Sequence, residues 1–354
     1  MTWSDWKWQL QNRITTLADL EKEITLTEEE RDSFARAYER FQFAVTPYYL
    51  QQLDKNNPHC PIRKQILPRA GELVRKPNET DDPLAEETHM PVKGVTHRYP
   101  DRAIWYISHV CAVYCRFCTR KRKVSDPEET PNRMEWEKAL DYFRTQTKLR
   151  EVILSGGDPL TLSDSTLDTL LSELKQIPHL NQIRIHTRHP VTMPMRLTES
   201  LNSVFSKHFP LYMVTHFNHP NEISEETKFY VMRMIKEGHV SVFNQSVLLS
   251  GINDDAEILS DLNYKLISIG IKPYYLHQCD EVFGSSDFVV PMEKGIEIYR
   301  KLRGHHSGIT IPNYVKDLTG GGGKVLLSPK YLQKKTENGY LFQNYLGDEY
   351  EVGH

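Results

Sequence analysis

A regular alternation of short apolar runs and amphipathic segments fills the chain from about residue 101 to residue 303 and restricts its fold more than any other feature. Six runs have the length and composition of strands: 103–107, 151–154, 182–185, 211–214, 240–244 and 272–276. Helix-like segments follow them near 134–145, 165–176, 197–206, 223–237, 255–269 and 292–303. Six β-α units in series predict an α/β fold with a parallel sheet, either open or closed into most of a barrel.

Two regions of different character flank this repeat. Residues 1 to about 53 show helical spacing, and Thr27 followed by three glutamates is typical of a helix start. Residues 56–100 are rich in proline, which favours an irregular connector. We therefore expect a helical N-terminal region and connector over 1–95, a partial (β/α)6 barrel over 96–308 and a C-terminal segment over 309–354.

Composition excludes several classes of protein. The chain has 354 residues and a net charge of −3, and its mean hydropathy is −0.55, so nothing favours binding to nucleic acid or to an anionic membrane. No apolar run approaches the roughly 20 residues of a membrane span. The five cysteines are an odd number and the first residues lack a signal-peptide core, which together indicate thiols in a reducing cytoplasm.

Three of the cysteines follow the first predicted strand with the spacing C-x3-C-x2-C, as Cys111, Cys115 and Cys118. Three thiolates can ligate three irons of a [4Fe-4S] cube and leave the fourth open for a ligand that reacts there. A zinc site is the alternative, since His109 could act as a fourth ligand, but no second ligand pair follows. The spacing resembles that of the radical S-adenosylmethionine enzymes.

Other notable residues also stand where predicted strands end. The segment 156–158, Gly-Gly-Asp, follows the second run, and His216, Gln245 and Asp280 stand at or after later runs. Two glycines let the backbone approach a ligand that a side chain would exclude, although a Gly-Gly turn after a strand is common in any case. Because the carboxyl ends of parallel strands share one edge of a sheet, we expect these residues to lie close to the cysteines. By resemblance to the radical S-adenosylmethionine enzymes, which use such a segment, the Gly-Gly-Asp segment is expected to hold the amino group of S-adenosylmethionine.

A glycine-rich segment, 319–324, ends in Lys324. It is similar to a phosphate-binding loop, but that pattern needs Ser or Thr after the lysine and Val325 stands there. A lysine on a flexible arm could instead form a Schiff base with the aldehyde of pyridoxal phosphate, and a plain linker is the remaining alternative.

Charged residues elsewhere could serve such a cofactor and its substrate. Arg98, Tyr99 and Arg102 precede the first run and offer cationic donors for a phosphate. Asp280 and Asp317 could together pair with an ammonium group, although each alone would suit a surface loop.

Taken together, these residues resemble the lysine 2,3-aminomutase family, whose members use radical S-adenosylmethionine chemistry and pyridoxal phosphate. Besides the cysteine motif, the similarity covers Cys60–Gln65, Asp82–Glu86, Thr96–Arg102, His216–Glu222, Pro273–Tyr275, Gln278–Asp280 and Gly323–Lys324.

The resemblance implies a role for each candidate residue. These are Cys111, Cys115 and Cys118 for the [4Fe-4S] cluster; Lys324 for the Schiff base with pyridoxal phosphate; Arg98, Tyr99 and Arg102 for its phosphate; Gly156, Gly157, Asp158 and Gln245 for S-adenosylmethionine; and Arg120, Asp280 and Asp317 for the substrate. Two carboxylates at the distal end of the substrate favour a basic amino acid, and above all lysine, whereas a glutamate-specific relative needs a cation or amide there.

The activity implied is an isomerase that interconverts L-lysine and β-lysine by 1,2-amino migration. Arginine or ornithine as substrate, supply of β-lysine for modification of elongation factor P, and a non-catalytic iron-sulfur or pyridoxal sensor are the alternatives. Expected partners are the amino acid, an electron donor of the flavodoxin or ferredoxin type, and further copies of the chain.

The sequence departs from the family pattern in three places. The segment 253–255 has no cysteine, and the tail to His354 carries no cysteine-rich extension, so we expect no zinc. His277 stands where a tyrosine is usual in the family.

Overall fold

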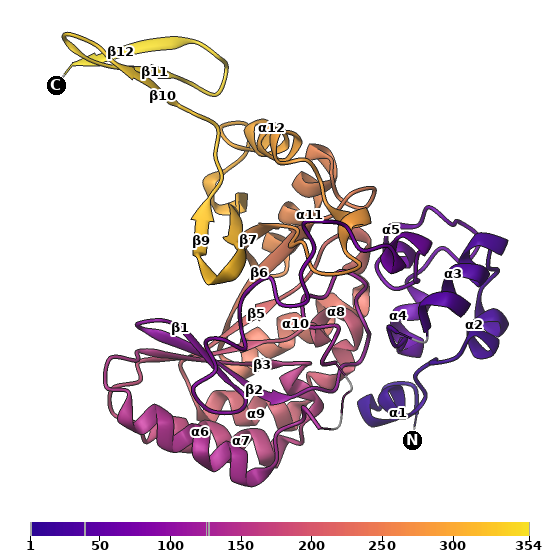
Figure 1. Ribbon diagram of the computed structural model, residues 1–354. Coiled ribbons are helices and arrows are strands. Elements are labelled where there is room, and N and C mark those ends of the chain that lie inside the picture. The colour runs from indigo at the N-terminus through magenta and orange to yellow at the C-terminus, as the bar shows by residue number, and fades with distance from the viewer. Residues whose placement is uncertain (1, 39, 125, 127, 354) are drawn as a thin grey trace.

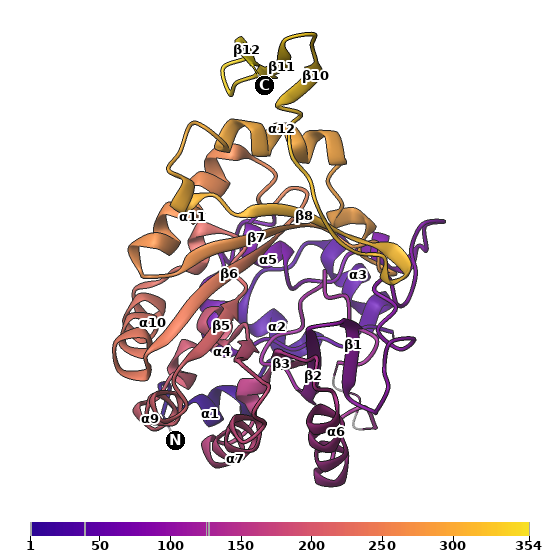
Figure 2. The ribbon, with the colours of Figure 1, turned by 90° about the vertical axis from the view of Figure 1, so that its left-hand side faces the viewer.

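The computed structural model describes residues 2–38, 40–124, 126 and 128–353. In that part of the chain the strands form a nine-stranded sheet whose spatial order is the order of the sequence, β1 to β9 (Figures 1 and 2). The strands β2 to β8 are parallel, and β1 and β9 add antiparallel edges. The bounds are Val95–Tyr99 (β1), Arg102–Ser108 (β2), Glu151–Gly156 (β3), Gln182–His186 (β4), Leu211–Thr215 (β5), Val240–Leu248 (β6), Lys272–Gln278 (β7), Asn313–Leu318 (β8) and Gly323–Leu326 (β9).

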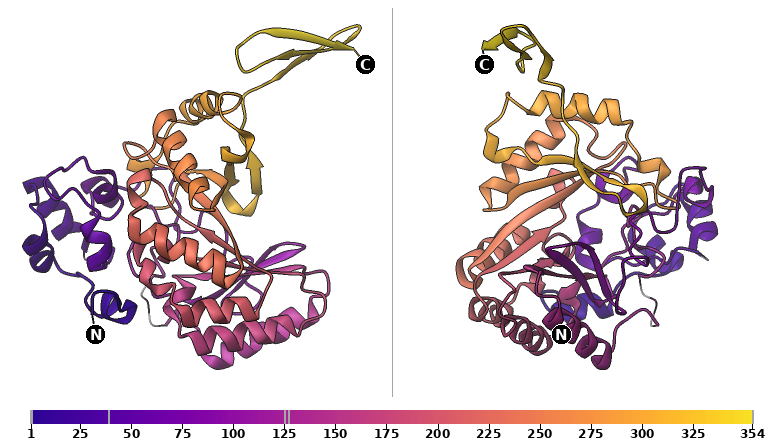
Figure 3. Two further views of the ribbon diagram at one scale, coloured as in Figure 1. Left: turned by 180° about the vertical axis from the view of Figure 1, so that it is seen from behind. Right: turned by 60° about the vertical axis from the view of Figure 1, so that its left-hand side comes forward.

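Six helices connect the parallel strands and lie on the outer face of the curved sheet, as the views in Figures 2 and 3 show. They are Arg133–Thr145 (α6), Asp164–Lys175 (α7), Glu199–Lys207 (α9), Glu225–Gly238 (α10), Ala256–Ser268 (α11) and Met292–Leu302 (α12). Most begin after a side chain that caps a free backbone N–H, namely Asn132, Ser163, Thr198, Ser224 and Asp255. The short helix α8, His189–Thr192, follows β4 directly.

This architecture confirms the predicted α/β fold with a partial barrel. Each of the six predicted strands and helices is present, with bounds that differ by a few residues. The strand β6 continues to Leu248, so Gln245 lies inside it and not at its end. The seventh parallel strand, β8, was not predicted, and it carries Asp317. The predicted division of the chain at residues 95 and 308 stays a prediction.

The N-terminal region is helical, as predicted, and packs against one side of the barrel (Figures 1 and 3). Its helices are Trp6–Gln11 (α1), Leu17–Glu23 (α2), Glu28–Tyr38 (α3), Pro47–Gln51 (α4) and Pro61–Lys64 (α5). Leu20 and Phe34 of this region belong to the same buried apolar cluster as Val152 and Leu167 of the barrel. The connector that follows is mostly irregular, apart from α5, the short 3-10 helix Ala70–Leu73 and β1.

The last residues form a second, small antiparallel sheet that projects away from the barrel (Figure 1). Its strands are Leu332–Lys335 (β10), Gly339–Gln343 (β11) and Glu349–Gly353 (β12). Sequence reasoning did not predict this sheet. Among the helices in the described ranges, none is long and apolar enough to cross a lipid bilayer.

Candidate active site

A cavity of about 530 Å³ lies inside the partial barrel and reaches the loops at the carboxyl ends of its strands. All of the residues that the sequence predicts for the site line it: Arg98, Tyr99, Arg102, Cys111, Cys115, Cys118, Arg120, Gly156, Gly157, Asp158, Gln245, Asp280, Asp317 and Lys324. The parallel strands therefore bring together side chains that are more than 200 residues apart in the sequence.

The loop that carries the cysteines runs from the end of β2 and is held by the N-terminal region. The backbone N–H of Tyr114 donates to the carbonyl of Ala44 at 3.0 Å. Arg116, between the second and third cysteines, is fully buried and binds both carboxylate oxygens of buried Glu72. The N-terminal helices and connector thus shape this loop, although none of the predicted cluster ligands comes from them.

The three cysteines are free thiols that line the same end of the cavity. Burial raises the pKa of Cys111 and Cys118, and neighbouring thiols raise it further. In the described part of the chain no three His, Cys, Asp or Glu side chains converge on one metal ion. A [4Fe-4S] cube does not need such convergence, because each thiolate ligates a different iron. Three separate free thiols that line one cavity fit that donor set.

The glycines after β3 allow the backbone of this loop to approach the backbone of residues 108–110 closely. The N–H of Gly157 donates to the carbonyl of Ser108 at 2.6 Å, and the N–H of Asp158 donates to that of Val110 at 2.8 Å. A Cβ atom on Gly156 would lie 2.0 Å from the Ser108 oxygen, and the φ of Gly156 is +125°. The pair of glycines therefore locks the loop after β3 onto the start of the cysteine loop.

The carboxylate of Asp158 is fully engaged within the protein. It accepts from the backbone N–H groups of Leu160 at 3.0 Å and Arg188 at 2.8 Å, and from the hydroxyl of Thr187 at 2.7 Å. His189 Nδ1 lies 2.6 Å away. This side chain ties the loops after β3 and β4 together, which sequence reasoning did not anticipate.

Lys324, which also lines the cavity, faces Asp317 across the β8–β9 ladder. Its Nζ binds the Asp317 carboxylate and lies 3.4 Å from Nδ1 of His277. Its backbone N–H donates to the hydroxyl of Tyr99 at 3.0 Å. The lysine is therefore fixed by three elements, β1, β7 and β8.

The glycines before Lys324 form a tight turn and not the flexible arm that the sequence suggests. Residues 319–322 connect β8 to β9, and Gly320, Gly321 and Gly323 have positive φ values of 74°, 83° and 91°. The N–H of Gly320 donates to the carbonyl of Pro83 at 3.0 Å, so the turn rests on the connector.

The three residues predicted for a phosphate lie together beside Lys324. A nitrogen of Arg98 donates to the hydroxyl of Tyr99 at 3.1 Å and also to Asp317 at 3.2 Å. The guanidinium of Arg102 lies 3.7 Å from the centre of the Tyr99 ring. Two cations and a phenol on one wall form an anion site of the kind a phosphate requires.

Arg120 has a partner that sequence reasoning missed. Its Nε and Nη2 bind the carboxylate of Glu86 at 3.0 and 2.6 Å, and its guanidinium lies 4.8 Å from the ring centre of Tyr106. Both members of the pair are largely buried, at 17% and 7% exposure. Within the part of the chain that the structure describes, Nη1 of Arg120 has no partner, so one edge of the guanidinium is left for a ligand.

The two predicted aspartates lie in opposite electrostatic settings. Burial raises the pKa of Asp280 to about 6, with Asp317 adding to the effect and Lys316, at 3.6 Å, opposing it. Burial alone would also raise the pKa of Asp317, but His277 and Lys324 hold it well below the ordinary range. Of the two carboxylates, Asp280 is therefore the one whose neighbouring positive charge does not offset the effect of burial.

Two half-buried histidines on the cavity wall have buried, unsatisfied nitrogens. Among the residues that the structure describes, the Nε2 atoms of His186 and His216 have no hydrogen-bond partner. Burial lowers the pKa of both side chains, so each ring is neutral. Orphaned buried polar atoms are rare, and these indicate that the cavity is built for a polar ligand.

Comparisons with known proteins agree with this chemistry. A family model described as Radical SAM superfamily matches residues 105–262, and one described as Lysine-2,3-aminomutase matches residues 299–349. The L-lysine 2,3-aminomutase of Clostridium subterminale is 43% identical over 345 residues, which cover 98% of this chain and 83% of that protein. That of Methanococcus maripaludis is 44% identical, with coverage of 98% and 80%. The glutamate 2,3-aminomutase of Clostridioides difficile is 39% identical, with coverage of 98% and 81%.

Proposed function

The chain belongs to the lysine 2,3-aminomutase family of radical S-adenosylmethionine enzymes, and we propose that it interconverts L-lysine and β-lysine by moving the amino group between C2 and C3. The observation that carries this proposal is one cavity lined by three thiols, by two aspartates and by Lys324, which pairs with one of those aspartates, Asp317. An enzyme of this family is an isomerase.

The residues present fit the three groups that the family uses. When bound, the [4Fe-4S] cluster and S-adenosylmethionine supply a carbon radical that abstracts hydrogen, and pyridoxal phosphate supplies an aldehyde that takes up the amine and delocalises spin. Cys111, Cys115 and Cys118 would hold the cluster, and Lys324 would hold the pyridoxal group covalently. Arg98, Tyr99 and Arg102 would bind its phosphate.

For S-adenosylmethionine, the side chain of Gln245 and the backbone of residues 156–158 are the proposed contacts. Gln245 lines the cavity from inside β6. The Asp158 carboxylate contributes indirectly, because its four partners fix the two loops that border this part of the cavity.

The pairing of Lys324 with Asp317 supports a role in substrate binding. While Lys324 carries an ammonium group, it neutralises Asp317. Where Lys324 would hold the pyridoxal group, Asp317 would be available to pair with the side-chain ammonium of the substrate. Asp280, already short of positive charge, is the second acceptor for the same ammonium. Arg120, whose guanidinium is oriented by Glu86, would bind the substrate carboxylate in bidentate fashion.

The same charges argue against glutamate as substrate. A second carboxylate would have to approach Asp280 and Asp317, and like charges this close in a buried site repel strongly. Arginine and ornithine carry the matching charge and differ from lysine in length or shape. They are therefore the competing substrates to test.

The proposal includes a cytoplasmic location, an electron donor of the flavodoxin or ferredoxin type, and self-association. An apolar face on the small sheet supports self-association. Leu332, Phe342 and Tyr350 are cross-strand neighbours on β10, β11 and β12, and all three are exposed.

The test is anaerobic reconstitution with iron, sulfide, pyridoxal phosphate, S-adenosylmethionine and a reductant, followed by incubation with lysine, arginine, ornithine and glutamate in separate reactions. We expect β-lysine from lysine and no product from glutamate. Formation of β-glutamate without β-lysine would contradict the substrate assignment. Lys324→Ala should abolish both activity and the visible absorbance of the bound pyridoxal group. The exposed Lys330→Ala, six residues on, serves as the matched control.

A further inference from the structure

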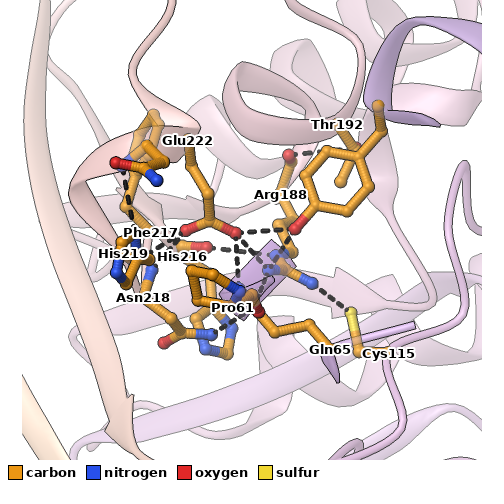
Figure 4. A network of polar contacts seen from close by, with 12 residues as sticks. Pro61, Gln65, Cys115, Arg188, Thr192, His216, Phe217, Asn218, His219 and Glu222 are labelled. Carbon is orange, nitrogen blue, oxygen red and sulfur yellow. Dashed lines mark hydrogen bonds and ion pairs between the residues drawn. The ribbon is translucent and has the colours of Figure 1, made fainter. Parts of the chain in front are cut away.

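A buried arginine donates a hydrogen bond to one of the proposed cluster ligands. Arg188 is two residues beyond the end of β4, and its Nη1 lies 2.6 Å from Sγ of Cys115 (Figure 4). Its side chain is 10% exposed, and it lines the cavity. We propose that Arg188 is a positioning residue for the cluster, which orients the Cys115 thiolate and makes the bound cluster easier to reduce. This inference rests on the proposed function, because it presupposes that Cys115 ligates iron.

The rest of the guanidinium is anchored on the side away from the sulfur. Nε donates to the carbonyl of His216 at 3.1 Å. Nη2 donates to Oε1 of Gln65 at 2.5 Å and to Oε1 of Glu222 at 2.9 Å, and lies 3.3 Å from the hydroxyl of Tyr49. These bonds come from the N-terminal region and from the loop after β5, so the group cannot turn away from Cys115 without breaking several of them.

The carboxylate that balances this cation is itself saturated. Glu222 is completely buried and accepts from the Tyr49 hydroxyl at 2.7 Å and the Gln65 amide at 3.1 Å. Its other oxygen accepts from the backbone N–H groups of Asn218 at 2.6 Å and His219 at 3.0 Å. Figure 4 shows how these donors surround Glu222 and leave the sulfur side of Arg188 facing the cysteine. A buried pair with every bond made keeps its geometry when a ligand binds nearby.

The consequence for the cluster follows from charge. Reduction adds an electron to the cluster and its thiolates, and a fixed cation that donates to a ligating sulfur stabilises this additional negative charge. A charge-assisted hydrogen bond in a buried site is strong enough to change an equilibrium about tenfold. For a one-electron couple, a tenfold change in the ratio of reduced to oxidised cluster corresponds to about 59 mV.

The experiment measures the midpoint potential of the reconstituted cluster without S-adenosylmethionine, by a redox titration followed by electron paramagnetic resonance. In Arg188→Met we expect the reduced fraction at a fixed potential to fall about tenfold, a shift of about 59 mV to more negative potential. Arg188→Lys keeps the charge but loses the fork of donors, so its potential should lie between those of wild type and Arg188→Met.

Arg63→Met is the matched control. Arg63 is also buried and binds Glu30 through Nε at 2.8 Å and Nη2 at 2.6 Å, but it does not line the cavity. This variant should lose stability and keep the wild-type potential. An equal shift of the midpoint potential in Arg63→Met would mean that the loss of any buried arginine disturbs the cluster. That result would overturn the inference.

Iron and sulfide content separates this inference from the proposed function. A wild-type chain that assembles no cluster would overturn both. A complete cluster with the wild-type potential in Arg188→Met would overturn only the role of Arg188. If Arg188→Met cannot retain iron, Arg188→Lys decides, and a wild-type potential in that variant would overturn the inference.

Discussion

Asp280→Asn should make the substrate-free protein more stable, although it removes a residue of the proposed substrate site. The pKa of Asp280 rises from 3.8 to about 6 on folding, chiefly through burial. When the pKa of an acid is higher in the folded than in the unfolded state, the protein loses stability as the pH rises above the pKa of the unfolded state. The reason is that the folded protein holds the charged carboxylate at a free-energy cost. At one pKa unit per ~1.4 kcal/mol, this cost is about 3 kcal/mol at pH 8 and about half of that at pH 5.

Asparagine has the same shape and no charge, so the substitution should raise the free energy of unfolding by up to ~3 kcal/mol at pH 8, and the gain should be ~1.5 kcal/mol smaller at pH 5. Urea denaturation followed by circular dichroism at both pH values measures it. The reconstituted variant should in turn require much more lysine for half-maximal rate. This combination of higher stability and weaker function is common for residues selected for a site.

Asp254→Asn is a control of opposite sign. Asp254 binds Lys294 at 2.5 Å, and although burial works against it, hydrogen bonds from Lys294 and the backbone keep its pKa below the ordinary value. Its substitution should give no gain at either pH. If Asp280→Asn destabilised the protein at pH 8, or if its gain were the same at pH 5 and pH 8, the reasoning about a carboxylate held at a cost would be wrong.

Three further substitutions test other parts of the site. Glu86→Gln removes the charge that fixes the orientation of the Arg120 guanidinium. We expect the KM for lysine to rise about tenfold with a smaller effect on kcat. Steady-state kinetics in which kcat alone fell would contradict this. Gly156→Ala places a methyl group 2.0 Å from the Ser108 oxygen at a positive φ, so it should cost more than ~2 kcal/mol of stability and reduce iron loading, and an unchanged urea midpoint with full iron content would refute it. Phe342→Glu puts a charge on the exposed face of the small sheet and should lower the mass measured by analytical ultracentrifugation, whereas an unchanged mass would exclude that face as the contact.

The part of the fold that shows a regular pattern of apolar residues could be predicted from the sequence. The six β-α units could be found because each strand is a short apolar run and each helix has one apolar face. The strand β8 was missed because its residues, Asn313–Leu318, mix apolar with charged side chains, and one of those charges is Asp317, which faces the cavity. The small sheet β10–β12 was missed because its strands mix apolar with polar side chains and are largely exposed.

The site was predictable as a set of residues but not as a set of contacts. The positions of the cysteines, of the segment 156–158 and of Asp280 follow from where parallel strands end. Their partners do not, because Glu86 reaches Arg120, and Arg188 reaches Cys115, across gaps in sequence that only tertiary folding closes. Arg188 could have been suspected, since it stands two residues after the end of a strand, where several of the other candidates also stand.

The turn between β8 and β9 has a consequence for how this part of the chain can vary. Lys324 lies opposite Asp317 because the ladder of backbone hydrogen bonds puts it there, and side chains along a strand alternate between the two faces. A turn that is one residue longer would bring Gly323 opposite the aspartate, and a turn that is one residue shorter would bring Val325 there; either change would point the lysine away from the cavity. The length of this glycine-rich turn therefore sets the register of β9 against β8. Single insertions or deletions there should be more damaging than substitutions that keep the number of residues in the turn.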